Sequence, residues 1–165
     1  MKRLLRERLC FRAPLHSRIL AHLCLASVVT GCGEAAQSKT NPAALEMSSI
    51  SNTLPTTYRW DTLADGAVVY SDRWLTYRSV PVQLSGLPYL VTANNDKAST
   101  AASFVSFVVD RPVKVYVAHD PRIGAKPAWL STFANTGLGL QSSDTTRTVY
   151  MRSYPAGSIT LGGNG

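Results

Sequence analysis

From Tyr58 onward, short apolar runs rich in β-branched and aromatic residues alternate with polar runs that contain Gly, Pro, Asn and Asp. This pattern is typical of short β-strands joined by turns. In residues 113–118, for example, the valines fall on one face of an extended chain while Lys114 and Tyr116 fall on the other. The segments expected to form strands are 67–70, 74–78, 89–93, 103–109, 113–118, 138–141, 146–153 and 158–161.

The same region shows no helical period, and the chain's nine prolines would interrupt most helices. Regular short strands of this kind predict an all-β fold, namely an antiparallel β-sandwich of jelly-roll or immunoglobulin-like type. We expect one such domain over residues 58–165, a length that suits a single hydrophobic core.

The chain begins with a different pattern. A basic segment is followed by an apolar run over residues 19–29, which is too short to span a bilayer permanently and closes on Thr30 and Gly31. This pattern predicts a cleaved secretory leader over residues 1–31. Residues 33–57 are rich in Ser, Thr, Ala, Asn and Pro without a sustained apolar period, so we expect residues 32–57 to form a flexible tether.

The formal net charge of +7 does not by itself indicate a nucleic-acid partner, because most of it lies near the N-terminus. Residues 1–18 contain six basic residues and one acidic residue, so five of the seven net charges lie in the expected leader. Nucleic-acid binding needs a basic stripe that displaces counterions from phosphates, and the remaining chain has no such cluster. We therefore expect no nucleic-acid partner.

The three cysteines also lie near the N-terminus. Cys10 and Cys24 fall in the leader, and Cys32 directly follows it. The expected domain therefore has no thiol, which excludes an intradomain disulfide and a cysteine-ligated metal. Its single histidine, His119, does not support a zinc site of nitrogen ligands. The weaker metal candidates are the oxygen-rich residues Asn94, Asn95 and Asp96, which could bind calcium. No cofactor is expected.

Catalytic chemistry has little support in the sequence. His119 is followed by Asp120, and a Ser–His–Asp arrangement stays open because such groups meet only in space. However, the sequence contains no nucleophile-elbow motif. Asp96, Asp120 and Asp144 could supply an acid and a base, but they stand in Asn-Asp, Asp-Pro and Ser-Asp pairs, which turns favour. We therefore expect a protein that is not an enzyme.

Aromatic residues form the other group of interest. Carbohydrate-binding sandwiches present aromatic faces for stacking on sugar rings, beside planar polar groups. The candidate ligand-binding residues of this type are Tyr116, Asp120, Arg122, Trp129, Tyr150 and Arg152. Two alternatives stay open: Trp129 as a packed core residue, and Arg122 as an internal tie to a carboxylate.

The segment Val29-Thr30-Gly31-Cys32 resembles the cleavage box of bacterial lipoproteins. In that family the cysteine receives a diacylglycerol, the leader is cut before it, and the new amino terminus is acylated. The resemblance implies lipidation of Cys32 and a stable membrane anchor, because several acyl chains bind far more firmly than one. It implies a place in the bacterial cell envelope. Gly33 follows the cysteine in place of Asp, which is compatible with export to the outer membrane, the location that we expect.

A second resemblance covers nearly all of residues 58–164. Its motifs are YSDR at 70–73, VPVQLSG at 80–86, TANNDK at 92–97, VYVAHDPR at 115–122, PAWL at 127–130 and YPAGSITLGGN at 154–164. They resemble a small β-sandwich module appended to secreted polysaccharide-degrading enzymes and other bacterial surface proteins. The resemblance implies a carbohydrate-binding or surface-binding domain whose partner is a polysaccharide or cell-surface glycan. The alternative is a structural or protein-interaction module that assembles secreted enzymes at the envelope.

Overall fold

The computed structural model describes residues 46–52, 54 and 57–164. The expected leader, Cys32 and the first part of the expected tether lie outside these residues. Within the described part, the fold is all-β, with nine strands, two short 3-10 turns and no α-helix. No described helix is long and apolar enough to cross a membrane. The prediction of an antiparallel β-sandwich is confirmed.

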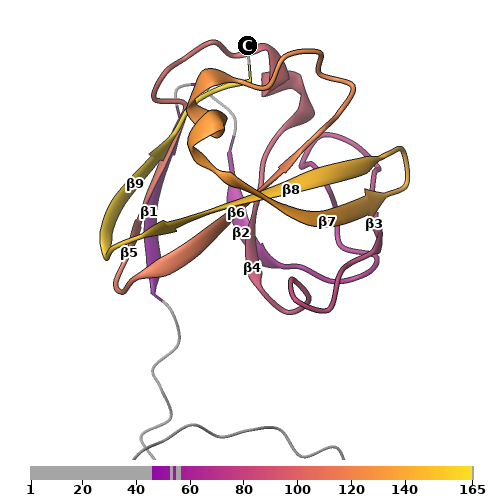
Figure 1. Cartoon of the computed structure of the whole chain (residues 1–165), viewed down its shortest axis with the longest axis horizontal. Coiled ribbons are helices and arrows are strands. Elements are labelled where there is room, and N and C mark those ends of the chain that lie inside the picture. The colour runs from indigo at the N-terminus through magenta and orange to yellow at the C-terminus, as the bar shows by residue number, and fades with distance from the viewer. Residues whose placement is uncertain (1–45, 53, 55–56, 165) are drawn as a thin grey trace, which may run out of the picture. The chain divides into compact units, whose positions relative to one another are not determined.

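One side of the sandwich is a four-stranded antiparallel sheet with the strand order β3-β7-β8-β6 (Figure 1). Its strands are β3 (Tyr77–Ser79), β7 (Ala134–Ser142), β8 (Thr146–Tyr154) and β6 (Val113–His119). The strands β7 and β8 form a hairpin through a tight turn at residues 143–145. β6 lies at one edge of this sheet, paired along its whole length with β8.

Two smaller antiparallel sheets oppose it. The first has the order β1-β5-β9 and the second pairs β2 with β4. Their strands are β1 (Met47–Asn52), β5 (Val105–Val109), β9 (Gly157–Leu161), β2 (Arg59–Thr62) and β4 (Pro88–Val91). The two 3-10 turns are η1 (Asn94–Ala98) and η2 (Ala128–Thr132).

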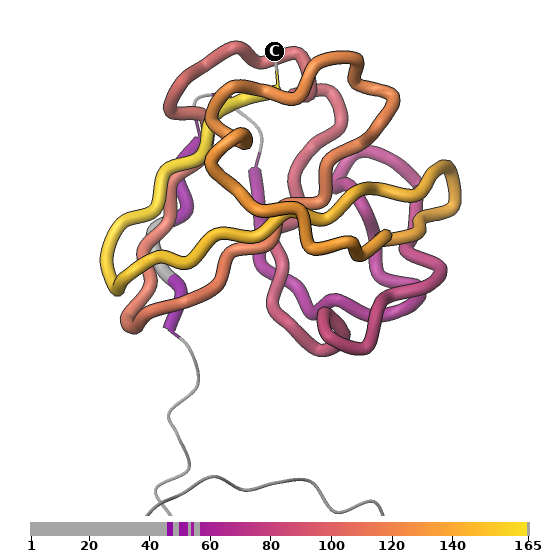
Figure 2. Tube along the Cα trace, viewed as in Figure 1, coloured from indigo at the N-terminus to yellow at the C-terminus, as the bar shows by residue number. Residues whose placement is uncertain are grey.

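Two adjacent turns join the four-stranded sheet to the β1-β5-β9 sheet. One links β5 to β6 between Val109 and Val113, and the other links β8 to β9 between Tyr154 and Gly157. They are neighbours because Val109 pairs with Gly157 while Val113 pairs with Tyr154. Figure 2 shows the two turns side by side at the lower left of the trace. Gly157 has a φ of 125°, which an L side chain rarely adopts.

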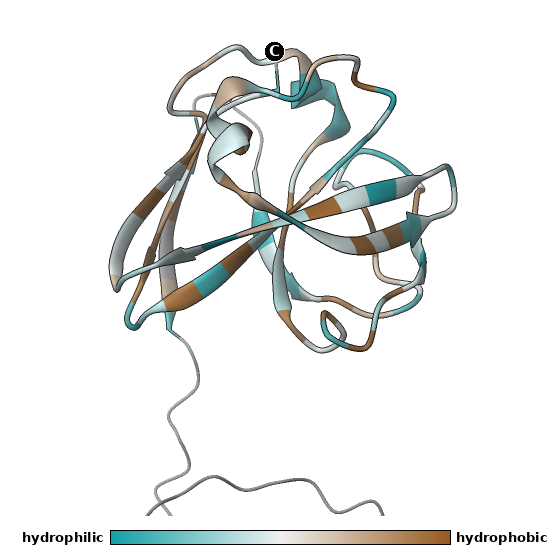
Figure 3. Cartoon of the chain, in the orientation of Figure 1, coloured by the Kyte–Doolittle hydropathy of each residue, from teal (hydrophilic) through white to brown (hydrophobic). Residues whose placement is uncertain are grey.

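The core lies in contiguous clusters between the sheets. One joins Tyr77, Leu140 and Val149 of the four-stranded sheet to Leu63, Val69 and Leu84 of the opposite side. A second surrounds Phe107 and Ile159 of β5 and β9, where Val113 and Val115 of β6 pack against them. A third surrounds Tyr58, Ala93 and Val105. Figure 3 shows that brown hydrophobic positions alternate with hydrophilic ones along several strands, as half-buried strands require.

The structure corrects the N-terminal boundary of the domain. The strand β1 lies within the residues expected to be tether, yet it pairs with β5 from Met47↔Val109 to Asn52↔Val105. Met47 packs on the cluster around Phe107, and Ile50 packs on the cluster around Tyr58. Two apolar contacts and a ladder of backbone hydrogen bonds are enough to hold this polar segment, although its composition favours a loop.

Several other boundaries differ from the expected ones. β2 was not expected, and the segment 67–70 contributes only isolated bridges at Val68 and Tyr70. The strand expected at 74–78 is confined to Tyr77–Ser79, because residues 71–75 belong to a turn and the irregular segment that follows it. The later strands lie where the alternating pattern placed them, within a few residues at each end.

Candidate functional site

The residues Asp120 and Arg122 form an ion-pair network with the β7–β8 turn. Arg122 Nη2 lies 2.6 Å from Asp120 Oδ2 and 2.6 Å from Asp144 Oδ2. Arg122 Nε also donates to Asp120 Oδ1 at 2.9 Å. These hydrogen bonds from Arg122 lower the pKa of Asp120 to about 2. The arrangement matches the alternative in which Arg122 is an internal tie.

Arg147 extends this network into the core. Its side chain is 3% exposed, and its Nη2 lies 3.5 Å from Asp144 Oδ1 and 3.9 Å from Asp120 Oδ2. Arg147 also donates to the hydroxyls of Ser142 and Tyr70. Buried charges persist in proteins when they are paired and hydrogen-bonded, as this one is. The network therefore fastens the start of β8 to the loop after β6 and to Tyr70.

Trp129 is held in place by contacts with Gly162 and Gly163. Its indole Nε1 donates to the carbonyl oxygen of Gly163 at 2.8 Å, and its ring meets Phe133 edge to face at 5.7 Å between centroids. A Cβ on Gly162 would collide with the Trp129 ring, so glycine is needed there. The contacts of Trp129 match the alternative in which it is a packed residue.

The remaining three candidates lie on both faces of the β6–β8 pair. Tyr116 pairs with Met151, whereas Tyr150 pairs with Val117, so the two tyrosines point to opposite faces. Tyr150 lies beneath Lys126, whose Nζ is 4.9 Å from the ring centroid.

Arg152 is exposed but already bonded, because its Nη1 donates to Thr132 Oγ1 at 2.9 Å and its guanidinium stacks over Tyr154. The structure therefore brings Asp120 and Arg122 together but does not gather the six candidates into one surface.

The calcium candidates lie in η1, and protein donors already engage two of them. Asp96 is buried and its Oδ2 accepts a hydrogen bond from Tyr58 Oη at 2.7 Å. Asn95 Oδ1 accepts from Arg73 Nη2 at 2.5 Å. Among the described residues, no group of three or more His, Cys, Asp or Glu side chains is placed to hold a metal ion. The geometry therefore gives no support to calcium at Asn94, Asn95 and Asp96.

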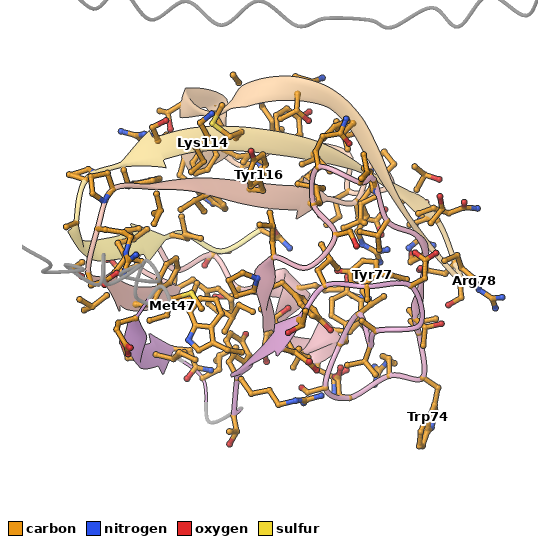
Figure 4. The ribbon with its side chains drawn as sticks, turned by 90° about the horizontal axis from the view of Figure 1, so that it is seen from below. Met47, Trp74, Tyr77, Arg78, Lys114 and Tyr116 are labelled. Atoms are coloured by element: carbon orange, nitrogen blue, oxygen red, sulfur yellow. The ribbon has the colours of Figure 1, made fainter. Side chains whose placement is uncertain are left out.

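Sequence reasoning missed Trp74, whose side chain is fully exposed at 102% relative accessibility. Figure 4 shows it projecting away from the domain. It ends the turn at residues 71–74, and a hollow of about 340 Å³ beside it is lined by Arg59, Tyr70, Asp72 and Arg73. An aromatic residue directly after Ser71-Asp72-Arg73 was the available signal, but residues 74–78, which include Trp74, were interpreted as one strand.

The turn that carries Trp74 is held in place by Asp72. The two carboxylate oxygens of Asp72 accept the backbone N–H groups of Asn94 and Asn95 at 2.8 and 3.0 Å. Partial burial opposes ionisation of Asp72, but these two bonds and the nearby Arg73 outweigh it and lower its pKa. Asp72 is therefore ionised at neutral pH and fastens the turn to η1.

A larger cavity of about 860 Å³ lies between the sheets. Aromatic and aliphatic side chains from both sides of the sandwich line it, among them Tyr58, Trp60, Phe107, Tyr116 and His119. Figure 4 shows Tyr116 on the layer of β6 and Met47, another lining residue, on the opposite layer.

Two buried nitrogens of this lining, Trp60 Nε1 and His119 Nε2, have no hydrogen-bond partner. Burial lowers the pKa of His119. Because His119 Nε2 has no partner, no serine hydroxyl of the described residues makes the hydrogen bond to it that a Ser–His–Asp triad would require.

No protein-family model and no curated protein matches this chain. The domain is similar to part of a β-glucuronidase from glycoside hydrolase family 2, with 24% identity and a TM-score of 0.63 over 70% of this chain. It is also similar to part of a GH138 enzyme targeting pectin rhamnogalacturonan II, with 18% identity and a TM-score of 0.52 over 73% of this chain. The matches span 12% and 15% of those longer chains, and they show the fold alone.

Proposed function

We propose that this chain is a non-enzymatic glycan-binding module of the bacterial cell envelope, and that Trp74 is its sugar-stacking residue. The observation that carries the proposal is the full exposure of the Trp74 indole on a fastened turn. Large aromatic side chains normally bury most of their surface, so a tryptophan held in water calls for a partner.

The surroundings of Trp74 have the polar groups that a sugar needs. Arg59, Asp72 and Arg73 line the hollow beside it and offer planar donors and acceptors for hydroxyl groups. Arg73 is itself oriented, because its Nη1 donates to the backbone carbonyl of Asp72 at 2.7 Å and its Nη2 donates to Asn95. A rigid platform loses less entropy when it binds than a mobile one.

The fold comparisons support the same class of ligand. Both similar structures are glycoside hydrolases, and in each the matched part is a small fraction of the chain. A module that forms a small part of a glycoside hydrolase suits attachment to a glycan.

Of the sequence-based candidates, Tyr116 stays exposed on β6, while Asp120 and Arg122 bond to each other.

A glycan array probed with the full chain and with Trp74→Ala tests the proposal. The substitution should remove about 1–3 kcal/mol of binding free energy, by analogy with aromatic stacking on nucleobases. The melting temperature should stay nearly unchanged because the exposed side chain contributes little packing.

The matched control is Trp129→Ala, which should lower the melting temperature because Trp129 is bonded and packed. Undiminished glycan binding by Trp74→Ala would remove Trp74 from the site. If no glycan binds the wild-type chain at all, the alternative of a structural or protein-interaction module replaces the proposal.

We propose further that Cys32 carries the lipid that anchors the domain, on the outer membrane. The lipoprotein-like box ending at Cys32 supports this part, and Gly33 supports the choice of membrane. After detergent phase separation, the wild-type protein should enter the detergent phase, and Cys32→Ser should stay in the aqueous phase. Equal partitioning of the two proteins into the aqueous phase would contradict lipidation.

A further inference from the structure

We infer that the cavity between the sheets is a second binding site, which takes an uncharged, largely apolar small molecule bearing an oxygen acceptor. None of residues 71–74 lines the cavity, although Tyr70 lines both the cavity and the hollow beside Trp74. The inference is therefore independent of glycan binding at Trp74.

The size of the cavity is the first observation. Protein interiors are packed as densely as organic crystals and contain few voids larger than a water molecule. A cavity of about 860 Å³ in a domain of this length lies within the range of roughly 300–1,000 Å³ that is usual for small-molecule sites. The cavity is partly open to solvent, so a small molecule has a route into it.

The second observation is the pair of buried nitrogens without a partner. Of the described residues, only Trp60 and His119 have a buried side-chain nitrogen or oxygen that lacks a hydrogen bond. Both residues line this cavity, and His119 is only 8% exposed. Buried polar groups are nearly always paired, and each exception needs an explanation. A ligand oxygen accepting the indole N–H of Trp60 would supply the missing bond.

The residues that line the cavity determine the polarity and the charge of a ligand that could bind there. Aromatic and aliphatic residues such as Trp60, Phe107 and Val149 predominate, so the body of the ligand must be largely apolar. The arginines of the lining are already paired, since Arg122 and Arg147 share the carboxylates of Asp120 and Asp144. The two lysines of the lining, Lys97 and Lys114, are both exposed to solvent, so a charged head group in the buried part of the cavity would meet no unpaired cation and would lose its hydration, which is costly. The ligand is therefore uncharged.

The dye Nile red is a suitable probe because it is uncharged, apolar and carries a carbonyl oxygen. The experiment uses the full chain with Cys32→Ser, so that no acyl group competes for the cavity. Nile red fluorescence should rise to saturation with this protein. Ala118→Phe, which places a ring in the cavity lining, should abolish the saturable rise. Ala128→Phe is the matched control, because Ala128 is exposed and outside the lining, and it should bind like the parent.

A milder variant covers the case in which Ala118→Phe does not fold. Trp60→Phe keeps an aromatic ring but removes the indole N–H, so it should weaken Nile red binding about two- to tenfold, as expected for one hydrogen bond. The indole N–H signals of the three tryptophans give a direct readout by nuclear magnetic resonance. Added Nile red should shift the Trp60 signal, identified by its loss in Trp60→Phe, and leave that of Trp74 in place.

Three results would overturn the inference. They are no saturable fluorescence with the parent chain, equal binding by the parent and a folded Ala118→Phe, and an unmoved Trp60 signal at saturating dye. Each of them would leave a cavity that holds only water. Trp74→Ala separates the two sites, because it should lose glycan binding and keep the dye.

Discussion

At the scale of single residues, the charged side chains of this domain act mainly on one another. Arg147 is the clearest case, because it is almost completely buried and reaches two carboxylates and two hydroxyls. Removing one partner from such a group leaves the others buried without compensation. The network around Arg147 is thus a structural device of the sandwich.

Arg147→Ala should destabilise the domain by about 3–5 kcal/mol, the cost of breaking a buried ion pair. Urea denaturation measures the change. Arg152→Ala is the matched control on the same strand, because Arg152 is exposed and should cost less than about 1 kcal/mol. Equal effects of the two substitutions would contradict the structural role of Arg147.

The pKa of Asp120 adds a prediction about acid. Its value of about 2 in the folded domain lies below the usual 3.8, so the carboxylate stabilises the fold above about pH 4. That stability should fall as the pH drops from about 4 to about 2. Because Arg122 is largely exposed, solvent screening reduces the contribution to about 1–2 kcal/mol.

Asp120→Asn tests this by denaturation at several pH values. The variant should be less stable at pH 7, and its stability should fall less between pH 4 and pH 2 than that of the parent. A parallel decline in both proteins would place the acid sensitivity elsewhere, for example at Asp72 or Asp144, whose pKa values are also lowered.

The candidate site shows which of its features could be predicted from residue types alone and which could not. The sequence left open the packed role of Trp129 and the tie at Arg122, and the structure supports both. Trp74 escaped notice because exposure depends on where a turn projects, and the sequence around Trp74 has the aromatic content of a strand. The cavity escaped notice because a void is a property of packing between segments distant in sequence.

At the scale of elements, the strands with strict alternation were predictable and the others were not. β6 alternates valines with Lys114 and Tyr116, and β8 is a long run rich in β-branched and aromatic residues, and both lie close to their expected positions. β1 and β2 are short and largely polar, so they carry no such signal. They become strands because β5 and β4 offer them an edge, which is a tertiary effect.

The role of β1 can be tested by truncation. A chain that begins at residue 58 should lose about 2–4 kcal/mol relative to one that begins at residue 46, because Met47 and Ile50 no longer cover the core. Hydrogen exchange in β5 should accelerate in the shorter chain, since one edge of β5 loses its partner. Identical melting temperatures and exchange rates would show that β1 contributes nothing to the domain.

At the scale of the whole molecule, stability rests on packing and on backbone pairing. The part of the chain that the structure describes contains no cysteine, and the three cysteines of the sequence lie before it. Far-ultraviolet circular dichroism should show a β-rich spectrum, because the described fold is all-β. The melting temperature measured in this way should be the same with and without a reductant. A lower melting temperature after reduction would reveal a stabilising disulfide among Cys10, Cys24 and Cys32.

The position of β5 between β1 and β9 has a consequence for biosynthesis. Ile159 of β9 fills the space beside Phe107, yet it is among the last residues of the described part to leave the ribosome. Until residues 157–161 exist, β5 lacks one neighbour and its core face stays open. Closing such distant pairs is slow compared with forming local hairpins. In the envelope location proposed above, this delay would keep the chain unfolded until it has crossed the membrane.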